Sequence, residues 1–282
     1  MVEVRYHGRF GNNLFQYALG RIIAQELGFA LHASPIEGCP NTSEVVSGIC
    51  AKEPEQVLRE HHIDLAAILG DQTPRKIILD GYFQRQEYYA PFRPALQRWF
   101  RQESVPSSGS FAATDVVAHI RRRDYVRHGY ALPFAFYEHA ITQALPPNGR
   151  LTIATDDPWD PFFWRFSRWK PQFLKGSNTA QMHQLLHAPR LVMSASSYSW
   201  WPAFLGDAEL IICPEPSCGV WDHSRSQGPD LFIPEKFTAL GAMTPYSPNA
   251  LEAAYQRCQR WRCRLVEHIN RKWGACIRVP SY

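Results

Sequence analysis

The chain has 282 residues, of which 45% are hydrophobic and 13% aromatic, and its formal net charge is +4. This apolar content suffices for one large or two ordinary domains and excludes a disordered chain. No apolar run reaches the roughly 18 residues that a membrane-spanning helix needs. Basic residues are not interleaved with aromatic ones over a long tract, so we expect no nucleic-acid partner.

The seven cysteines form an odd set without a CxxC pair. This pattern argues against a disulfide framework or a zinc site and favours a reducing compartment. The chain opens directly on residues 2–6, which alternate like a strand, with no signal peptide before them. We therefore expect a cytoplasmic protein.

The amino-terminal residues predict a strand, a glycine-bearing loop and a helix. Residues 2–6 form the strand, and apolar residues recur at helical spacing from Leu14 to Leu27. Asn12 or Asn13 would cap the helix and Gly28 would end it. The first-turn amides of such a helix can hold an anion.

An irregular region follows, in which prolines interrupt the apolar pattern of residues 33–74. We expect an insertion or binding loop there. A strand is predicted at 76–82, a helix at 96–100 and a linker at 106–110, which sets the domain boundary. The expected units are an acceptor-side α/β domain at 1–110, a nucleotide-binding Rossmann-like domain at 111–248, and a basic helix and tail at 249–282.

The second half alternates strands with helices. Predicted strands lie at 116–120, 151–155, 190–193 and 209–213, and predicted helices at 134–145, 158–168 and 179–187, with a short one starting at Ser196 or Ser197. The strands are apolar throughout, which is typical of a parallel sheet covered on both faces. The expected fold is α/β, with two Rossmann-like halves and a closing carboxyl-terminal helix.

The expected carboxyl-terminal helix, at about 249–272, mixes arginines with large apolar residues. They are Arg257, Arg260, Arg262, Arg264, Arg271 and Lys272, with Trp261, Leu265, Ile269 and Trp273. Such a helix packs its apolar stripe on the protein body and leaves its charges in water. The alternative is contact with an anionic membrane surface.

Three polar sequences follow predicted strands, at 119–124, 155–157 and 194–199. Ligands bind outside the carboxyl ends of such strands, so all three are expected to face one site. Arginines and serine hydroxyls donate to phosphates, and an aspartate can accept the paired N–H groups of guanine, so a guanine diphosphate fits. The alternatives are a solvated basic turn for the arginines and helix caps for the other two sequences.

Five motifs, taken together, resemble the bacterial α1,2-fucosyltransferases, glycosyltransferase family 11. They are GRFGNNLFQYA at 8–18, DGYFQ at 80–84, HIRRRDY at 119–125, TDD at 155–157 and SSYSWW at 196–201. They occur in the family's order, and the serine-to-tryptophan ending is similar to the α1,2 group in particular. The arginine motif is shared with α1,6- and protein O-fucosyltransferases.

The resemblance implies a GT-B-type fold and inverting transfer of fucose from GDP-β-L-fucose to O2 of a terminal β-galactose. The acceptor would be a surface glycan, assembled on a lipid carrier. No metal or other cofactor is expected, and the chain contains no Asp-x-Asp to hold a divalent cation against a nucleotide sugar. Arginine must then neutralise the leaving diphosphate, and Arg121 is the expected catalytic residue.

The same resemblance implies the remaining site residues. The donor-binding set is Asn12, His119, Arg122, Asp156, Asp157, Ser196, Ser197 and Tyr198. Within it, His119 and Asp156 or Asp157 would meet the ribose or guanine, Ser196, Ser197 and Tyr198 the phosphates, and Asn12 the fucose side. Arg123 and Pro202 stand where the family usually has glycine.

The sequence offers several candidates for the catalytic base. Asp124 is the carboxylate nearest the arginines, but their charges lower its pKa and weaken it as a base, so it could instead orient Arg121 or Arg122. Glu87, Glu37 and His7 are alternatives from the acceptor half. The competing hypotheses for the whole protein are a fucosyltransferase of α1,6 or O-linked specificity and a non-catalytic GDP- or glycan-binding module.

Overall fold

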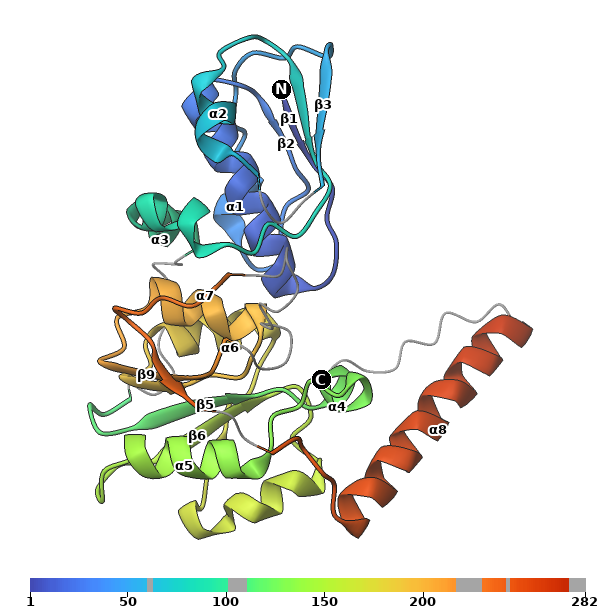
Figure 1. Cartoon of the computed structure of the whole chain (residues 1–282). Coiled ribbons are helices and arrows are strands. Elements are labelled where there is room, and N and C mark those ends of the chain that lie inside the picture. Colours follow the sequence, from blue (N-terminus) through green and yellow to red (C-terminus); the bar gives the residue numbers. More distant parts are fainter. Residues whose placement is uncertain (60–62, 101–110, 217–229, 242–243, 274–282) are drawn as a thin grey trace.

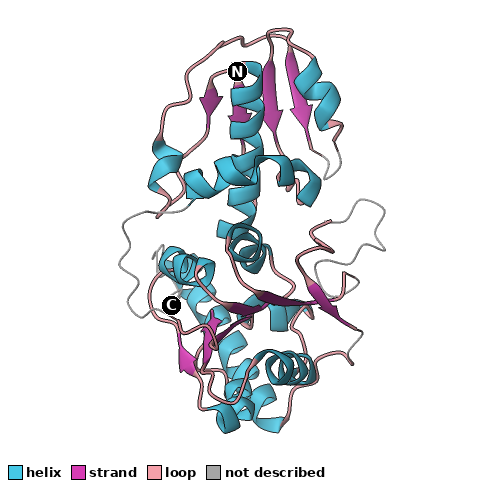
Figure 2. Cartoon of the chain, turned by 90° about the vertical axis from the view of Figure 1, so that its left-hand side faces the viewer, coloured by secondary structure: helices cyan, strands magenta, loops and turns pink. Residues whose placement is uncertain are grey.

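The computed structural model describes residues 1–59, 63–100, 111–216, 230–241 and 244–273. Its strands form two parallel sheets, one at each end of the body, with helices packed around and between them (Figures 1 and 2). The expected α/β class with two Rossmann-like halves is confirmed. The predicted linker at 106–110 lies outside the described residues.

The first sheet has the strand order β2-β1-β4-β3 and its pairs are parallel. Its strands are β1 (Val2–Val4), β2 (Leu31–His32), β3 (Glu55–Leu58) and β4 (Lys76–Leu79). The expectation that residues 33–74 are irregular was wrong, because β3 and the short helix α2 (Leu65–Gly70) lie within them. Elements this short complete too few periods to show in a sequence pattern.

Helix α1 (Phe10–Leu27) follows β1 and ends at Gly28, whose φ of 65° is the left-handed conformation expected there. The helix begins at Phe10 with Arg9 as its N-cap, so the predicted caps, Asn12 and Asn13, were wrong. Gly8, at φ 77°, turns the chain early enough for the helix to start there. The other helices of this half are α3 (Arg93–Phe100) and short 3-10 helices at Pro40–Ser43, Gln86–Tyr88 and Ala90–Phe92.

The second sheet has the order β10-β9-β8-β5-β6-β7, again with parallel pairs. Its strands are β5 (Val116–Ile120), β6 (Leu151–Thr155), β7 (Gln172–Phe173), β8 (Arg190–Val192), β9 (Leu210–Pro214) and β10 (Thr238–Leu240). In chain order this is the doubly wound 3-2-1-4-5-6 arrangement of a dinucleotide-binding fold. The predicted strands are confirmed, and the short edge strands β7 and β10 were missed.

The helices of this half match most predictions. They are α4 (Arg123–His128), α5 (Phe134–Ala144), α6 (Asn178–Leu186) and α7 (Ser197–Leu205). The segment expected as a helix at 158–168 is instead a 3-10 helix, Pro161–Trp169. Its aromatic residues Phe163, Phe166 and Trp169 recur every third position, which matches the three residues per turn of that helix.

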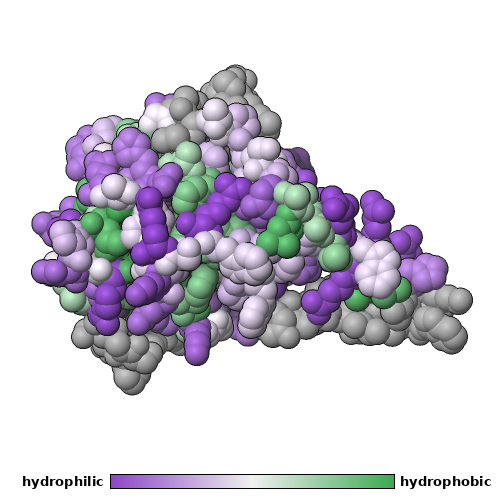
Figure 3. All heavy atoms as spheres, turned by 90° about the horizontal axis from the view of Figure 1, so that it is seen from below, coloured by the Kyte–Doolittle hydropathy of each residue, from purple (hydrophilic) through white to green (hydrophobic). Residues whose placement is uncertain are grey.

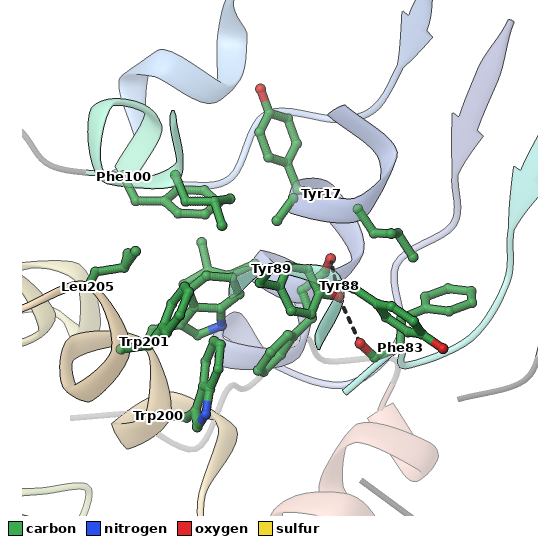
Figure 4. Packing of buried hydrophobic residues seen from close by; sticks show 14 of the residues in the cluster. Tyr17, Phe83, Tyr88, Tyr89, Phe100, Trp200, Trp201 and Leu205 are labelled. Atoms are coloured by element: carbon green, nitrogen blue, oxygen red, sulfur yellow. Dashed lines mark hydrogen bonds between the residues drawn. The ribbon is translucent and has the colours of Figure 1, made fainter. Parts of the chain in front are cut away.

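A continuous aromatic core joins the two halves. Phe15 of α1 lies 4.9 Å from Trp200 and 4.6 Å from Trp201 of α7, measured between ring centroids. Tyr89 packs edge-on against both tryptophans (Figure 4). Trp201 Nε1 donates to the Gly11 carbonyl at 2.9 Å. The halves are therefore fixed to each other through fully buried side chains.

Helix α8 (Ala250–Trp273) packs on the 3-10 helix of the second half and then projects from the body (Figure 1). Near its start, buried Glu252 accepts from Arg165 at 2.7 Å, and Tyr255 donates to Asp157 at 2.9 Å. The predicted helix at 249–272 is confirmed. Among the described residues, no helix is long and apolar enough to cross a membrane.

Candidate functional site

Polar side chains meet where the strand order of the second sheet reverses. From β5 the chain leads to β6 on one side, and from β8 it leads to β9 on the other, while β5 and β8 pair directly. His119 in β5 lies with Nδ1 3.0 Å from the hydroxyl of Ser194, just beyond β8. Such a switch point is where open α/β sheets bind ligands. The expectation that these strand ends meet is confirmed.

Arg121 follows β5 and is the central cation of this group. Its guanidinium lies 2.6 Å from Asp124 Oδ1 and 3.2 Å from Asp156 Oδ2, with only 14% of the side chain exposed. Its face lies over the Tyr125 ring, 5.1 Å from the centroid. Its Nε is buried and, among the described residues, has no hydrogen-bond acceptor. A buried donor left without a partner is costly, so the position suits an incoming anionic oxygen.

Arg122 has a different place from Arg121. Its side chain is fully buried, and Nε donates to Asp160 at 2.8 Å. The guanidinium lies over the rings of both Phe162 and Tyr246, at 3.9 and 4.5 Å from their centroids. The sequence grouped Arg122 with the donor ligands, whereas these contacts give its side chain the role of fixing the ends of β5 and β6.

The two adjacent aspartates after β6 also differ. Asp156 accepts the Arg122 backbone N–H at 2.8 Å and faces Arg121. Asp157 is turned towards α8, where it accepts from Tyr255, and burial raises its pKa. Asp156 is therefore the aspartate that shares the site with Arg121.

The rings of His119 and Tyr198 contact each other in a tilted arrangement, with centroids 4.9 Å apart. Burial, together with the nearby charge of Arg121, lowers the pKa of His119 to about 3, so its imidazole is neutral at pH 7. The Tyr198 hydroxyl donates to the Asn178 carbonyl, and burial raises its pKa. Neither group carries charge near neutrality, so the positive charge here is that of Arg121.

The buried His119 makes stability depend on pH. The unfolded chain gains a proton below about pH 6.5, whereas the folded chain stays unprotonated down to about pH 3. The free energy of unfolding should therefore fall on acidification by up to about 1.4 kcal/mol per pH unit from this group. We expect His119→Gln to reduce the dependence of the free energy of unfolding on pH, measured by urea denaturation between pH 6.5 and 5. His139→Gln, on the exposed face of α5, should leave this dependence unchanged. His183 also has a lowered pKa, so some slope should remain.

The start of α7 packs directly on the start of α1. Ser196 caps α7 by accepting the Tyr198 N–H, and the Ser197 hydroxyl donates to Asn12 Oδ1 at 2.7 Å. A Cβ on Gly11 would lie 2.6 Å from the Tyr198 nitrogen, so only glycine permits this approach. Asn12 and Ser197, predicted in different halves, are thus brought together.

Gln84 is a site residue that was not predicted, although it is the last residue of the motif at 80–84. Its amide donates to Asn12 Oδ1 at 2.7 Å, which places it beside Ser197. The preceding Phe83 has φ 52°, an outlier for a bulky residue, and its carbonyl accepts from the buried Tyr89 hydroxyl at 2.7 Å (Figure 4). Backbone strain of this kind is typical of functional loops.

Arg9 is a second missed residue. From the loop before α1, its guanidinium reaches Asp124 Oδ1 at 3.2 Å, so Asp124 faces Arg9 and Arg121 together. The same carboxylate oxygen therefore accepts from two guanidinium groups, which suits Asp124 to hold them in place. Of the alternative bases, Glu87 pairs with Arg85 at 2.7 Å, and Glu37 is exposed and receives a hydrogen bond from Thr179 on its carbonyl. His7 lies against Asp80.

The two departures from the family pattern leave the site intact. Arg123 begins α4 and is not among the described residues with positive φ, so glycine is not needed there. Pro202 lies in the second turn of α7 rather than in its first turn. Among the described residues, no group of three or more His, Cys, Asp or Glu side chains could hold a metal ion.

No protein-family model and no curated protein matches the chain. It is similar to two solved structures of NodZ alpha-1,6-fucosyltransferase, one soaked with GDP-fucose and one co-crystallised with GDP. The first has 14% identity and a TM-score of 0.46, and the second 13% and 0.42. Both alignments cover 73% of this chain and 92% of the other.

Proposed function

We propose that the protein transfers L-fucose from GDP-β-L-fucose to O2 of a terminal β-galactose, with inversion and without a metal ion. The observation that carries this proposal is Arg121 at the switch point of a dinucleotide-type sheet, whose buried Nε has no acceptor within the described part of the chain. The five motifs support it, because each contributes a residue to the contacts around this point: Asn12, Gln84, Arg121, Asp156 and Ser197.

In the proposed reaction the bond between the sugar and the diphosphate breaks while the acceptor oxygen attacks from the opposite face. Negative charge grows on the β-phosphate as it leaves, and Arg121 stabilises it more in the transition state than in the ground state. Asp156 and Asp124 hold the guanidinium in place. His119, as a neutral imidazole, would meet the ribose or guanine, with Ser197 and Asn12 towards the phosphates and the fucose.

The test is release of GDP from GDP-fucose by the purified protein, with lactose or N-acetyllactosamine present or absent and EDTA throughout. We expect release that the galactoside stimulates and EDTA does not abolish, and a product with an α1,2 linkage. Transfer with another linkage would keep the donor proposal and reject the acceptor. Tight GDP binding without turnover on any galactoside would instead indicate a binding module.

We also propose that α8 holds the enzyme at a membrane carrying a lipid-linked acceptor. Leu251, Trp261 and Leu265 are 46%, 67% and 41% exposed, and their spacing puts them on one side of the helix. Exposed arginines flank this side at positions 257, 260 and 264. The projecting arm at the right of Figure 3 is largely hydrophilic with paler residues among the charges. This combination suits an anionic lipid surface.

We expect the protein to sediment with vesicles containing anionic phosphatidylglycerol and not with neutral phosphatidylcholine. Arg260→Glu with Arg264→Glu should weaken binding by more than tenfold, since each basic residue contributes about 1 kcal/mol near such a surface. Trp261→Ser should weaken it at all salt concentrations. Lys170→Glu, exposed elsewhere, is the charge control. Equal sedimentation of all variants would contradict the proposal.

A further inference from the structure

A second polar pair lies at the reversal of strand order in the first sheet. In the order β2-β1-β4-β3, the adjacent central strands β1 and β4 are the first and last along the chain. Asp80 directly follows β4, and His7 follows β1 after Arg5, whose N–H still pairs with the Leu79 carbonyl at 2.9 Å. This is the same kind of position that Arg121 occupies in the second sheet. It therefore suits the second substrate of a two-substrate reaction.

His7 and Asp80 form a close, held pair. His7 Nε2 lies 2.6 Å from Asp80 Oδ1, and Arg59 Nε lies 3.3 Å from Asp80 Oδ2. The His7 hydrogen bond, with Arg59, keeps the pKa of Asp80 below its usual value. Asp80 therefore stays ionised and accepts a hydrogen bond from the Nε2–H of His7. This fixes the tautomer in which Nδ1 carries the lone pair.

Buried Gln16 holds the loop after β1 and the loop after β4 in fixed positions relative to each other. The Gln16 amide donates to the carbonyls of His7, at 3.3 Å, and Gly81, at 2.9 Å, and its oxygen accepts the His7 N–H at 3.1 Å. The His7 side chain itself is 43% exposed. Within the part of the chain that the structure describes, no hydrogen bond engages its Nδ1. The imidazole is thus oriented by its surroundings while one nitrogen faces solvent.

The loop that carries His7 also reaches the donor half. Arg9, two residues later, contacts Asp124, and Asn12 contacts Ser197. Tyr82 lies beside His7, with the ring centroids 6.1 Å apart, and is 41% exposed. A partly exposed aromatic side chain can pack on the apolar face of a sugar ring. One loop therefore carries His7, beside Tyr82, and Arg9, which contacts the Asp124 that holds Arg121.

We propose that His7 is the general base that deprotonates the acceptor hydroxyl, with Asp80 as its orienting carboxylate and Tyr82 as the platform for the acceptor sugar. This rests on the proposed function. The hydroxyl proton passes to His7 Nδ1 as the oxygen bonds to the anomeric carbon. The bond from that carbon to the phosphate oxygen breaks, and its electron pair leaves with GDP. Asp80 stabilises the resulting imidazolium. Asp124, already facing two arginines, then serves to position Arg121.

The test compares His7→Ala and His7→Gln with the wild type. We expect kcat for transfer to fall by about 10²- to 10⁴-fold, while the Kd for GDP changes by less than about twofold. Added imidazole should restore part of the activity of His7→Ala. Asp80→Asn should lower kcat less than loss of His7 does, and Tyr82→Ala should raise KM for the acceptor more than it lowers kcat. His32→Ala, an exposed histidine on β2, is the matched control.

The outcomes separate this assignment from the proposed function. If the wild type transfers fucose and folded His7→Ala keeps kcat within about threefold, the base is wrong while the function stands. A lack of rescue by imidazole, with His7→Gln fully active, would have the same meaning. If the wild type transfers to no acceptor although it binds GDP, the proposed function fails, and the base assignment fails with it. Thermal melting of each variant checks that it is folded.

Discussion

Replacing Arg121 with lysine is expected to lower kcat for fucosyl transfer by about 10²- to 10³-fold. Lysine keeps the charge but lacks the planar guanidinium group, which contacts both Asp124 and Asp156. Lysine also lacks Nε, the buried donor that has no acceptor among the described residues. Because charge on the leaving phosphate is greatest in the transition state, kcat should fall more than the affinity for GDP. Steady-state kinetics and calorimetric titration with GDP measure the two effects.

Arg127→Lys provides the matched control, since Arg127 lies exposed on α4 within the same basic stretch. It should leave both kcat and GDP affinity unchanged. Arg121→Lys with transfer within about threefold of the wild type would show that the arginine is structural. A loss of GDP affinity equal to the loss of kcat would show that it binds the nucleotide without acting on the leaving group.

The largest effect on stability is expected from Arg122→Met, which should lower the free energy of unfolding by about 3 to 5 kcal/mol. Methionine fills part of the space over the rings of Phe162 and Tyr246 but leaves the buried charge of Asp160 without its partner. Urea denaturation measures the change. Adding Asp160→Asn should recover part of it, because the amide carries no charge and can still accept from the Phe162 N–H.

Arg168→Met is the comparison for a surface arginine that has similar partners. Arg168 pairs with Glu138 at 3.1 Å and lies over the Trp169 ring, but more than half of its side chain is exposed. Solvent screening limits such a pair, so the loss should stay below about 1 kcal/mol. If both variants, Arg122→Met and Arg168→Met, lost the same free energy of unfolding, burial would not be what makes the Arg122 ion pair important for stability.

Much of the fold follows from the sequence because the central strands of the second sheet are apolar throughout, and β5 and β6 were predicted with the observed bounds. The meeting of His119, Arg121, Asp156 and Ser194 could also be predicted, since the ends of parallel strands share one edge. The edge strands β7 and β10 could not, because two or three residues carry no reliable period.

Contacts between distant residues account for what the sequence left open. Nothing in the arginine run distinguishes Arg121 from Arg122, because their roles depend on Asp160 and Tyr246 coming close to only one of them. Likewise, Asp157 differs in role from Asp156 because it accepts a hydrogen bond from Tyr255 on α8. Gly11 and Trp201 belong to motifs that suggested ligand binding, yet here they pack the two halves together.

Under the proposed function, the aromatic core shared by α1 and α7 bears on how acceptor specificity could be exchanged between enzymes of this fold. A chimera cut between the halves would pair a Phe15 from one parent with a Trp200 and Trp201 from another, across ring centroids only 4.9 and 4.6 Å apart. Close-packed interiors tolerate such mismatches poorly. A productive graft would therefore carry α7 along with the amino-terminal half, or transplant only the loops around Asp80 and Tyr82.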